Sequence, residues 1–195
     1  MPIQAIILNG GSSSGKTSIV RCFQDLRPEP WLAFSVDGFV DALPPRMLTA
    51  DPAPDSDSDS DAGTETSSNT GIQFGPDGEV SVGADFRELE AAWTAGVVAT
   101  ARAGARIIVD DVFLGGAASQ QRWEQALAGL DVLRVGVHCD SAVAASRESR
   151  RGDRTPGMAA RQAEIVHQGV RYDLEIDSTD TSAADCARLI AARIT

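Results

Sequence analysis

A stretch near the amino terminus has the residue types and spacing that bind nucleotide phosphates. Residues 10–17 match the pattern G-x-x-x-x-G-K-[ST] at every fixed position. The glycines let backbone N–H groups turn inward around phosphate oxygens, and the helix expected after them adds its positive end. Lys16 can bridge the β- and γ-phosphates, and the Thr17 hydroxyl can bind Mg²⁺. We therefore predict a loop that binds ATP with Mg²⁺ and consists of Gly10, Gly11, Ser12, Ser13, Ser14, Gly15, Lys16 and Thr17.

Lys16 is the only lysine among the 17 basic residues, and the other sixteen are arginine. A low lysine content can reflect genome composition alone. Yet the one position that keeps lysine is a position where arginine would fit the loop badly. The pattern also occurs by chance in unrelated proteins, but here it follows a predicted strand and opens a predicted helix, which is the context that a phosphate loop requires.

Three aspartates follow predicted strands, and the ligands of a parallel sheet bind where its strands end. Asp110 and Asp111 follow the apolar run 106–109, and one of them, with Asp110 preferred, can hold Mg²⁺; a turn or helix-capping role is the alternative. Asp37 follows the run 32–36, where a carboxylate can orient an acceptor hydroxyl and take its proton. Capping of the next helix explains Asp37 equally well on spacing alone.

Four arginines crowd the predicted end of a helix and the loop after it: Arg147, Arg150, Arg151 and Arg154. Like charges four residues apart repel each other on a helix unless anions compensate them. We predict that Arg147, Arg151 and Arg154 belong to a lid that closes over the phosphates of ATP. A solvated face balanced by acidic neighbours explains any single arginine equally well.

The apolar runs predict alternating strands and helices. Short runs without strict alternation are typical of strands covered on both faces, and they lie at 3–8, 32–36, 106–109, 132–139 and 172–176. Helices are expected at about 16–26, 39–47, 118–129, 141–150, 157–167 and 182–193, and one more begins at a capping box of Asp85 and Glu88 and ends before Gly104. This order predicts an α/β fold like that of P-loop kinases, an open parallel five-stranded sheet with helices on both faces.

Residues 51–70 interrupt this alternation. The segment contains six acidic residues, no basic residue and no large apolar residue. Such a composition cannot bury enough surface to offset the entropy lost on ordering. Because strands and helices resume on both sides of the segment, we predict a single domain of residues 1–195 with a disordered acidic insert at about 51–70.

The charge balance limits the possible partners. The chain has 17 basic and 28 acidic residues and a net charge of −11, of which six negative charges lie in residues 51–70, so that the remainder carries −5. A protein with so few cations is a poor candidate for binding nucleic acid or an anionic membrane. No basic leader precedes the first apolar run, and no run reaches the ~18 apolar residues that a membrane helix needs. We expect a cytoplasmic protein with a small-molecule substrate, and the oligomeric state stays open.

The remaining candidate residues favour structural roles. Cys22, Cys139 and Cys186 are widely spaced and form no disulfide or zinc pattern. His138 and His167 have no metal-like spacing and are expected to be a strand-end and a helix-face residue. Aromatic residues near strand ends could line an apolar acceptor pocket, and the candidates are Phe34 and Phe113.

In four segments the chain resembles the chloramphenicol phosphotransferases: IILNGGSS at 6–13, PWLAF at 30–34, GARIIVDDVFLGG at 104–116 and GDR at 152–154. The resemblance extends over nearly the whole chain apart from the acidic insert. It implies transfer of the γ-phosphate of ATP to the primary hydroxyl of chloramphenicol, which inactivates the antibiotic. It also implies that Asp37 is the catalytic base. The acidic insert and His138 are departures from the family's pattern.

Two other functions fit the same residues. A kinase of the same fold could act on a different small hydroxylated metabolite, because a fold does not determine the acceptor. A nucleotide-binding regulator is the second alternative, but proteins that read guanine usually contain Asn-Lys-x-Asp, and the only lysine here follows Gly15. The main prediction is therefore a chloramphenicol kinase in which Asp37 and Lys16 are catalytic and in which Thr17 and Asp110 bind Mg²⁺.

Overall fold

A computed structural model describes residues 2–50, 71–75, 78–151 and 157–194. The predicted acidic insert lies outside the described residues, as does Arg154 of the predicted lid. Within the described parts of the chain, no helix is long and apolar enough to cross a membrane.

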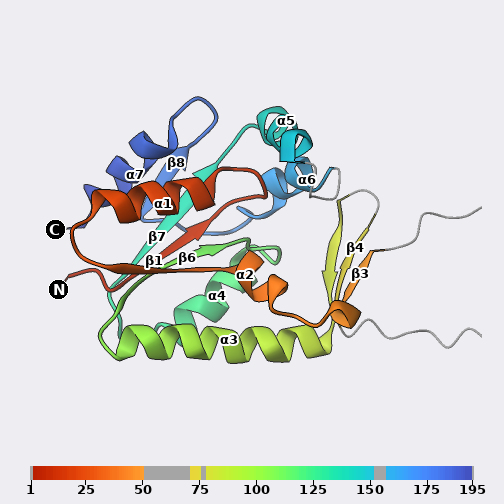
Figure 1. Ribbon diagram of the computed structural model, residues 1–195, viewed down its shortest axis with the longest axis horizontal. Helices are drawn as coiled ribbons and strands as arrows, with labels where there is room; N and C mark the ends of the chain where they lie inside the picture. Colours follow the sequence, from red (N-terminus) through yellow and green to blue (C-terminus); the bar gives the residue numbers. More distant parts are fainter. Residues whose placement is uncertain (1, 51–70, 76–77, 152–156, 195) are drawn as a thin grey trace, which may run out of the picture.

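Five parallel strands form the central sheet in the order β2-β6-β1-β7-β8 (Figure 1), which confirms the predicted fold class. The apolar runs that predicted these strands have few polar residues on either face, because both faces are covered. The strands are β1 (Ala5–Asn9), β2 (Trp31–Ser35), β6 (Arg106–Asp111), β7 (Val132–His138) and β8 (Leu174–Asp177).

Alternate residues of β1 pack against different helices. Ile6 and Leu8 belong to a core shared with α1 (Lys16–Leu26) and α7 (Ala183–Ala191). Ala5 and Ile7 belong to a second core shared with α3 (Ala84–Arg102) and α4 (Ala117–Ala126), and Figure 1 shows these two pairs of helices on opposite sides of the sheet. The strand before the phosphate loop is thus buried on both faces, at the point where the strand order reverses.

The predicted helix over 39–47 is wrong. The chain instead forms α2 (Val36–Asp41) and a separate single-turn helix, η1 (Pro45–Met47). Two consecutive prolines explain the break, because proline lacks an N–H donor and its ring clashes with the preceding helical turn. The shorter helix places its first turn directly after β2, beside the phosphate loop (Figure 1).

A second, small sheet was not predicted. It consists of β3 (Leu48–Ala50), β4 (Ile72–Phe74) and β5 (Val80–Val82), with β4 parallel to β3 and antiparallel to β5. A third apolar core supports it, in which Ile72 packs with Phe39, Met47 and Phe86. The small sheet lies away from the chain termini, near the end of the main sheet that carries the phosphate loop (Figure 1).

Of the two caps predicted for α3, the structure agrees with the one at the C-terminus and not with the one at the N-terminus. Gly83 is the N-cap and no side chain caps the helix, so the capping box of Asp85 and Glu88 is wrong. Gly104 follows the C-cap with a φ of 103°, in the left-handed region that glycine adopts without a Cβ penalty, and this terminus is as predicted. Helices α5 (Ser141–Arg151) and α6 (Met158–Ile165) complete the chain between β7 and β8.

Candidate active site

The loop between β1 and α1 has the backbone geometry of a phosphate-binding loop. Ser13 and Gly15 have φ values of 58° and 90°, so the loop turns through the left-handed region twice. A Cβ on Gly10 would lie 2.5 Å from the carbonyl oxygen of Val137, which explains why the loop needs glycine where it leaves the strand. Gly15 is the N-cap of α1, so the free N–H groups of that helix face the loop.

Three polar side chains of this loop are buried. Lys16 is only 6% exposed, and its Nζ donates to the carbonyl oxygens of Gly10 (2.8 Å) and Gly11 (3.0 Å). The hydroxyl oxygens of Ser13 and Ser14 are buried without a hydrogen-bond partner among the described residues. Buried polar atoms normally have partners, so these hydroxyls and the lysine fit a loop whose phosphate ligand supplies the missing contacts.

The structure distinguishes the two strand-end aspartates, between which the sequence analysis preferred Asp110. Asp110 faces the loop, where its carboxylate accepts from the Thr17 hydroxyl (2.8 Å) and lies 3.5 Å from Lys16 Nζ. Asp111 faces α4 and accepts from Trp123 Nε1 (2.5 Å), and burial raises the pKa of its carboxyl. A hydroxyl and a carboxylate are ligand types that Mg²⁺ prefers, so Thr17 and Asp110 fit the ion. Among the described residues no three His, Cys, Asp or Glu side chains form a metal cluster, so nucleotide oxygens would have to complete the coordination.

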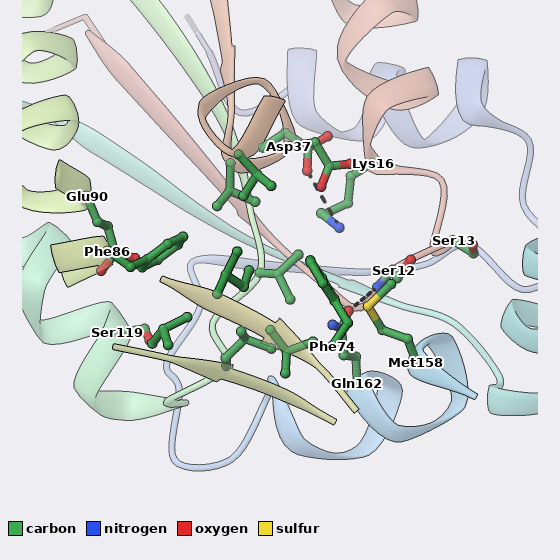
Figure 2. A pocket seen from close by; sticks show the side chains of 18 of the residues that line it. Ser12, Ser13, Lys16, Asp37, Phe74, Phe86, Glu90, Ser119, Met158 and Gln162 are labelled. Atoms are coloured by element: carbon green, nitrogen blue, oxygen red, sulfur yellow. Dashed lines mark hydrogen bonds and ion pairs between the residues drawn. The ribbon is translucent and has the colours of Figure 1, made fainter. Parts of the chain in front are cut away.

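Asp37 lies in the first turn of α2 and is exposed to the same pocket as Lys16 and Asp110 (Figure 2). The N-cap of α2 is Ser35, whose hydroxyl accepts from the backbone N–H of Gly38 at 3.0 Å. The capping explanation of Asp37 is therefore wrong. Ser35 pairs with Asp110 in the β2–β6 register, which is how two separate strand ends bring Asp37 to the phosphate loop.

The pocket extends from the phosphate loop to an apolar wall (Figure 2). Its polar end contains Lys16, Thr17, Asp37 and Asp110. The wall is built mainly from α2, the small sheet and α3, and its apolar residues include Val36, Val40, Ile72, Phe74, Val80, Val82 and Phe86. An arrangement of a phosphate loop, a carboxylate and an apolar wall can hold a nucleotide end to end with an apolar alcohol.

Phe34 and Phe113 do not line this pocket, contrary to the sequence-based expectation. Phe113 is buried in the core beneath α3 and α4, and Phe34 packs against the same core. Residues at the end of a strand alternate between the two sides of the sheet, so proximity to a strand end does not determine which side an aromatic ring covers. Phe74 and Phe86, from the small sheet and from α3, supply the aromatic surface instead.

Charged residues of α3 and α4 lie at the end of the pocket away from the phosphate loop. The Glu90 carboxylate lies 2.8 Å from Arg87 Nη1 and 3.9 Å from Arg122 Nη2, and Arg122 also donates to the Ser119 hydroxyl at 3.1 Å. Figure 2 shows Glu90 and Ser119 far from Ser12, on the other side of the apolar wall. One carboxylate between two guanidinium groups leaves this end with one net positive charge and several hydrogen-bonding groups.

Arg147 of the predicted lid does not line this pocket. Arg147 donates to the carbonyl oxygens of Ser178 (2.8 Å) and Thr179 (3.1 Å), and lines a separate hollow beside Gly15. Arg150 also lines this hollow. Arg151 is the last residue of α5, and Arg154 lies outside the described residues. The structure thus places Arg147 beside Gly15 at the start of α1, outside the pocket that contains the apolar wall.

A network around the two histidines was missed by the sequence analysis. Their rings stack with centroids 3.9 Å apart, although the residues are far apart in the sequence; His138 ends β7, and His167 follows α6 rather than lying on it. Tyr172 connects them to the loop, because its hydroxyl lies 2.6 Å from His167 Nδ1 and accepts from Asn9 Nδ2 at 2.6 Å. No local spacing could have predicted this network, but Asn9, directly before the first loop glycine in a buried strand, was a visible signal.

The same network predicts that folding stability depends on pH. Burial, and then the nearby His138, lower the pKa of His167 from 6.5 to about 4, against a smaller opposing effect of Glu175. Between these values the unfolded chain binds the proton and the folded chain does not, so the free energy of unfolding should decrease as the pH falls from 6.5 toward 4. Burial raises the pKa of Tyr172 to about 12, so its hydroxyl keeps its proton beside neutral His167.

Urea unfolding at about pH 7 and about pH 5 tests this expectation. The loss of stability between the two should be smaller for His167→Asn than for the unaltered protein, because asparagine keeps a hydrogen-bonding group but does not titrate. An equal loss in both proteins would show that His167 is not the titrating group.

Comparison with known proteins gives a match to a protein family. Residues 3–195 match the family model described as chloramphenicol phosphotransferase-like protein. Two proteins of Mycobacterium tuberculosis, from strains CDC 1551 and H37Rv, are each 32% identical to the chain over 192 residues, which covers 94% of the chain and 78% of each relative. Both are named O-phosphotransferases by inference.

Solved structures support the fold assignment. A Janibacter sugar kinase, unliganded, has a TM-score of 0.64 at 14% identity and covers 98% of this chain and 94% of its own. The Mycobacterium tuberculosis APS kinase in complex with AMPPNP and APS has a TM-score of 0.63 at 15% identity, with 98% and 96% covered. Acinetobacter baumannii shikimate kinase with shikimate has a TM-score of 0.57 at 12% identity, with 98% and 92% covered. At these identities the likeness shows a P-loop kinase fold.

Proposed function

Because the chain belongs to the chloramphenicol phosphotransferase-like family, we propose that it is an ATP-dependent kinase that phosphorylates the primary hydroxyl of chloramphenicol. The proposal is supported chiefly by one observation: Lys16, Thr17, Asp110 and Asp37 lie together in one pocket, at one end of its apolar wall. Such an enzyme would act in the cytoplasm, where ATP is present, and would inactivate the antibiotic.

The donor end would hold the nucleotide phosphates. The free N–H groups at the start of α1 and the Lys16 ammonium would supply positive potential for the β- and γ-phosphates. Thr17 and Asp110 would hold Mg²⁺, which neutralises charge on the phosphates when it is bound. Arg147 and Arg150, in the hollow beside Gly15, would contact the base or sugar of ATP rather than the transferred group.

Asp37 would act on the acceptor. Its carboxylate orients the primary hydroxyl and takes the proton as the hydroxyl oxygen bonds to the γ-phosphorus. The bond between that phosphorus and the oxygen bridging it to the β-phosphate breaks, and ADP carries away the electron pair. Lys16 stabilises the charge that is spread over the transferring group.

The apolar wall favours an aromatic alcohol over a small anionic one. Phe74 and Phe86 offer surface to an aromatic ring, and the polar groups around Glu90 lie at the end where a polar substituent of that ring would emerge. A different hydroxylated metabolite is the second candidate, because Arg87 and Arg122 together outnumber Glu90 and would attract a weakly anionic acceptor.

One assay tests the proposal and ranks the two candidates. The protein is incubated with Mg-ATP and chloramphenicol, and mass spectrometry should find the monophosphate. We expect kcat/KM to be higher for chloramphenicol than for shikimate, gluconate and nucleosides under the same conditions. A higher value for one of these three would identify the second candidate as the function, and preference for GTP without any acceptor would favour a regulator.

A further inference from the structure

Gln162 on α6 brings an amide group to the phosphate loop, where the sequence led us to expect arginine. Its Oε1 accepts from the backbone N–H of Ser12 at 2.8 Å, and the residue is only 5% exposed. Gln162 lines the same pocket as Lys16 and Asp37. Figure 2 shows it beside Ser12 and Met158, on the other side of the pocket from Asp37.

Helix α6 is held firmly against the loop. A Cβ on Gly11 would lie 3.0 Å from the backbone nitrogen of Ala163, so the loop and the helix are in close contact. The buried Glu148 carboxylate accepts from the backbone N–H groups of Gly157 (3.0 Å) and Ala159 (2.8 Å) and so fixes the start of α6. The position of the Gln162 amide is therefore set before any ligand binds.

One half of this amide has no partner. Because Oε1 is bonded to Ser12, Nε2 is on the other branch of the amide, and no described residue accepts a hydrogen bond from it. A primary amide carries two N–H donors, and because Gln162 lines the pocket a ligand there can accept from them. The group that would satisfy Nε2 is an acceptor in the pocket close to the first half of the phosphate loop.

We propose that Gln162 is a catalytic residue that donates an Nε2 hydrogen bond to the terminal phosphoryl group of ATP during transfer. This inference rests on the proposed function, because it requires a γ-phosphate between the loop and Asp37. The amide holds the phosphoryl group on the side opposite Asp37 and adds no charge. A guanidinium at this place would lower the proton affinity of Asp37.

The decisive variant is Gln162→Glu, because it tests the donor of the amide separately from the acceptor. A carboxylate keeps the acceptor for the Ser12 N–H but replaces the donor with a negative oxygen. Loss of one preorganised donor predicts that kcat falls at least about 100-fold. The affinity for AMPPNP should fall at least about 10-fold, while the affinity for ADP, which lacks the γ-phosphate, should change less than about twofold. Isothermal titration calorimetry measures both affinities without turnover.

Two further variants make the test interpretable. Gln168→Glu makes the same substitution at an exposed position shortly after α6 and should leave both affinities and kcat unchanged. Gln162→Met removes both the donor and the acceptor of the amide without adding charge, and should still weaken AMPPNP more than ADP. If Gln162→Glu does not fold, Gln162→Met decides.

The possible outcomes are distinct. Equal loss of AMPPNP and ADP affinity, or no loss of either, would overturn the proposal and leave Gln162 as a support for Ser12. If the unaltered protein binds both nucleotides but phosphorylates no acceptor, the proposed function fails, while the comparison of AMPPNP with ADP still decides whether Gln162 contacts the γ-phosphate.

Discussion

Asp37→Asn should lower kcat for phosphorylation of chloramphenicol at least about 100-fold, which is the lower range for loss of a general base. Asparagine has the same size and keeps a group that can orient the acceptor hydroxyl, but its amide cannot accept a proton. Asp37 lies in the first turn of α2, at the pocket but outside the phosphate loop. We therefore expect the affinity for AMPPNP to stay near that of the unaltered protein.

The matched control is Asp41→Asn, at the exposed last residue of the same helix. It removes one negative charge from α2 at a residue that does not line the pocket, and kcat should stay close to that of the unaltered protein. The pH profile of kcat gives a second readout. Loss of the base should abolish the decrease of kcat at low pH, which protonation of the base causes. An Asp37→Asn enzyme with nearly full kcat would show that another group takes the proton.

The predictable features were those that a short stretch of sequence determines. The phosphate loop depends on glycines at set positions within residues 10–17, and buried parallel strands are recognisable as unbroken apolar runs. The order β2-β6-β1-β7-β8 was not predicted, because right-handed crossovers between parallel strands are compatible with several orders.

The features that depend on distant contacts could not be predicted. Each strand of the small sheet is three residues long, too short for a pattern, and Ile72 is buried by residues from α2, η1 and α3. The choice between Asp110 and Asp111 depends on side-chain direction at the end of β6, where a one-residue difference changes the side of the sheet. Gln162 lies 150 residues from its partner Ser12, so no spacing connects the two.

Lys16→Met should reduce kcat about 1,000-fold, the upper range for loss of a single stabilising donor. The structure adds a second expectation, because Lys16 is not an exposed loop residue. Its ammonium is buried, bonded to two loop carbonyl oxygens and 3.5 Å from the carboxylate of Asp110. Removing one partner of a buried ion pair leaves the other charge uncompensated, so the melting temperature should fall as well.

Lys16→Arg separates catalysis from stability. Arginine keeps the positive charge near Asp110, so thermal unfolding should occur closer to that of the unaltered protein than for Lys16→Met. Its planar guanidinium is bulkier than an ammonium and cannot turn along the loop to place a compact charge between two phosphates, so kcat should remain as low as for Lys16→Met. Adding Asp110→Asn to Lys16→Met should recover part of the lost melting temperature without recovering kcat, because it removes the uncompensated carboxylate. Near-normal kcat in Lys16→Arg would show that the site needs only a positive charge there, and the phosphate-bridging role of Lys16 would be wrong.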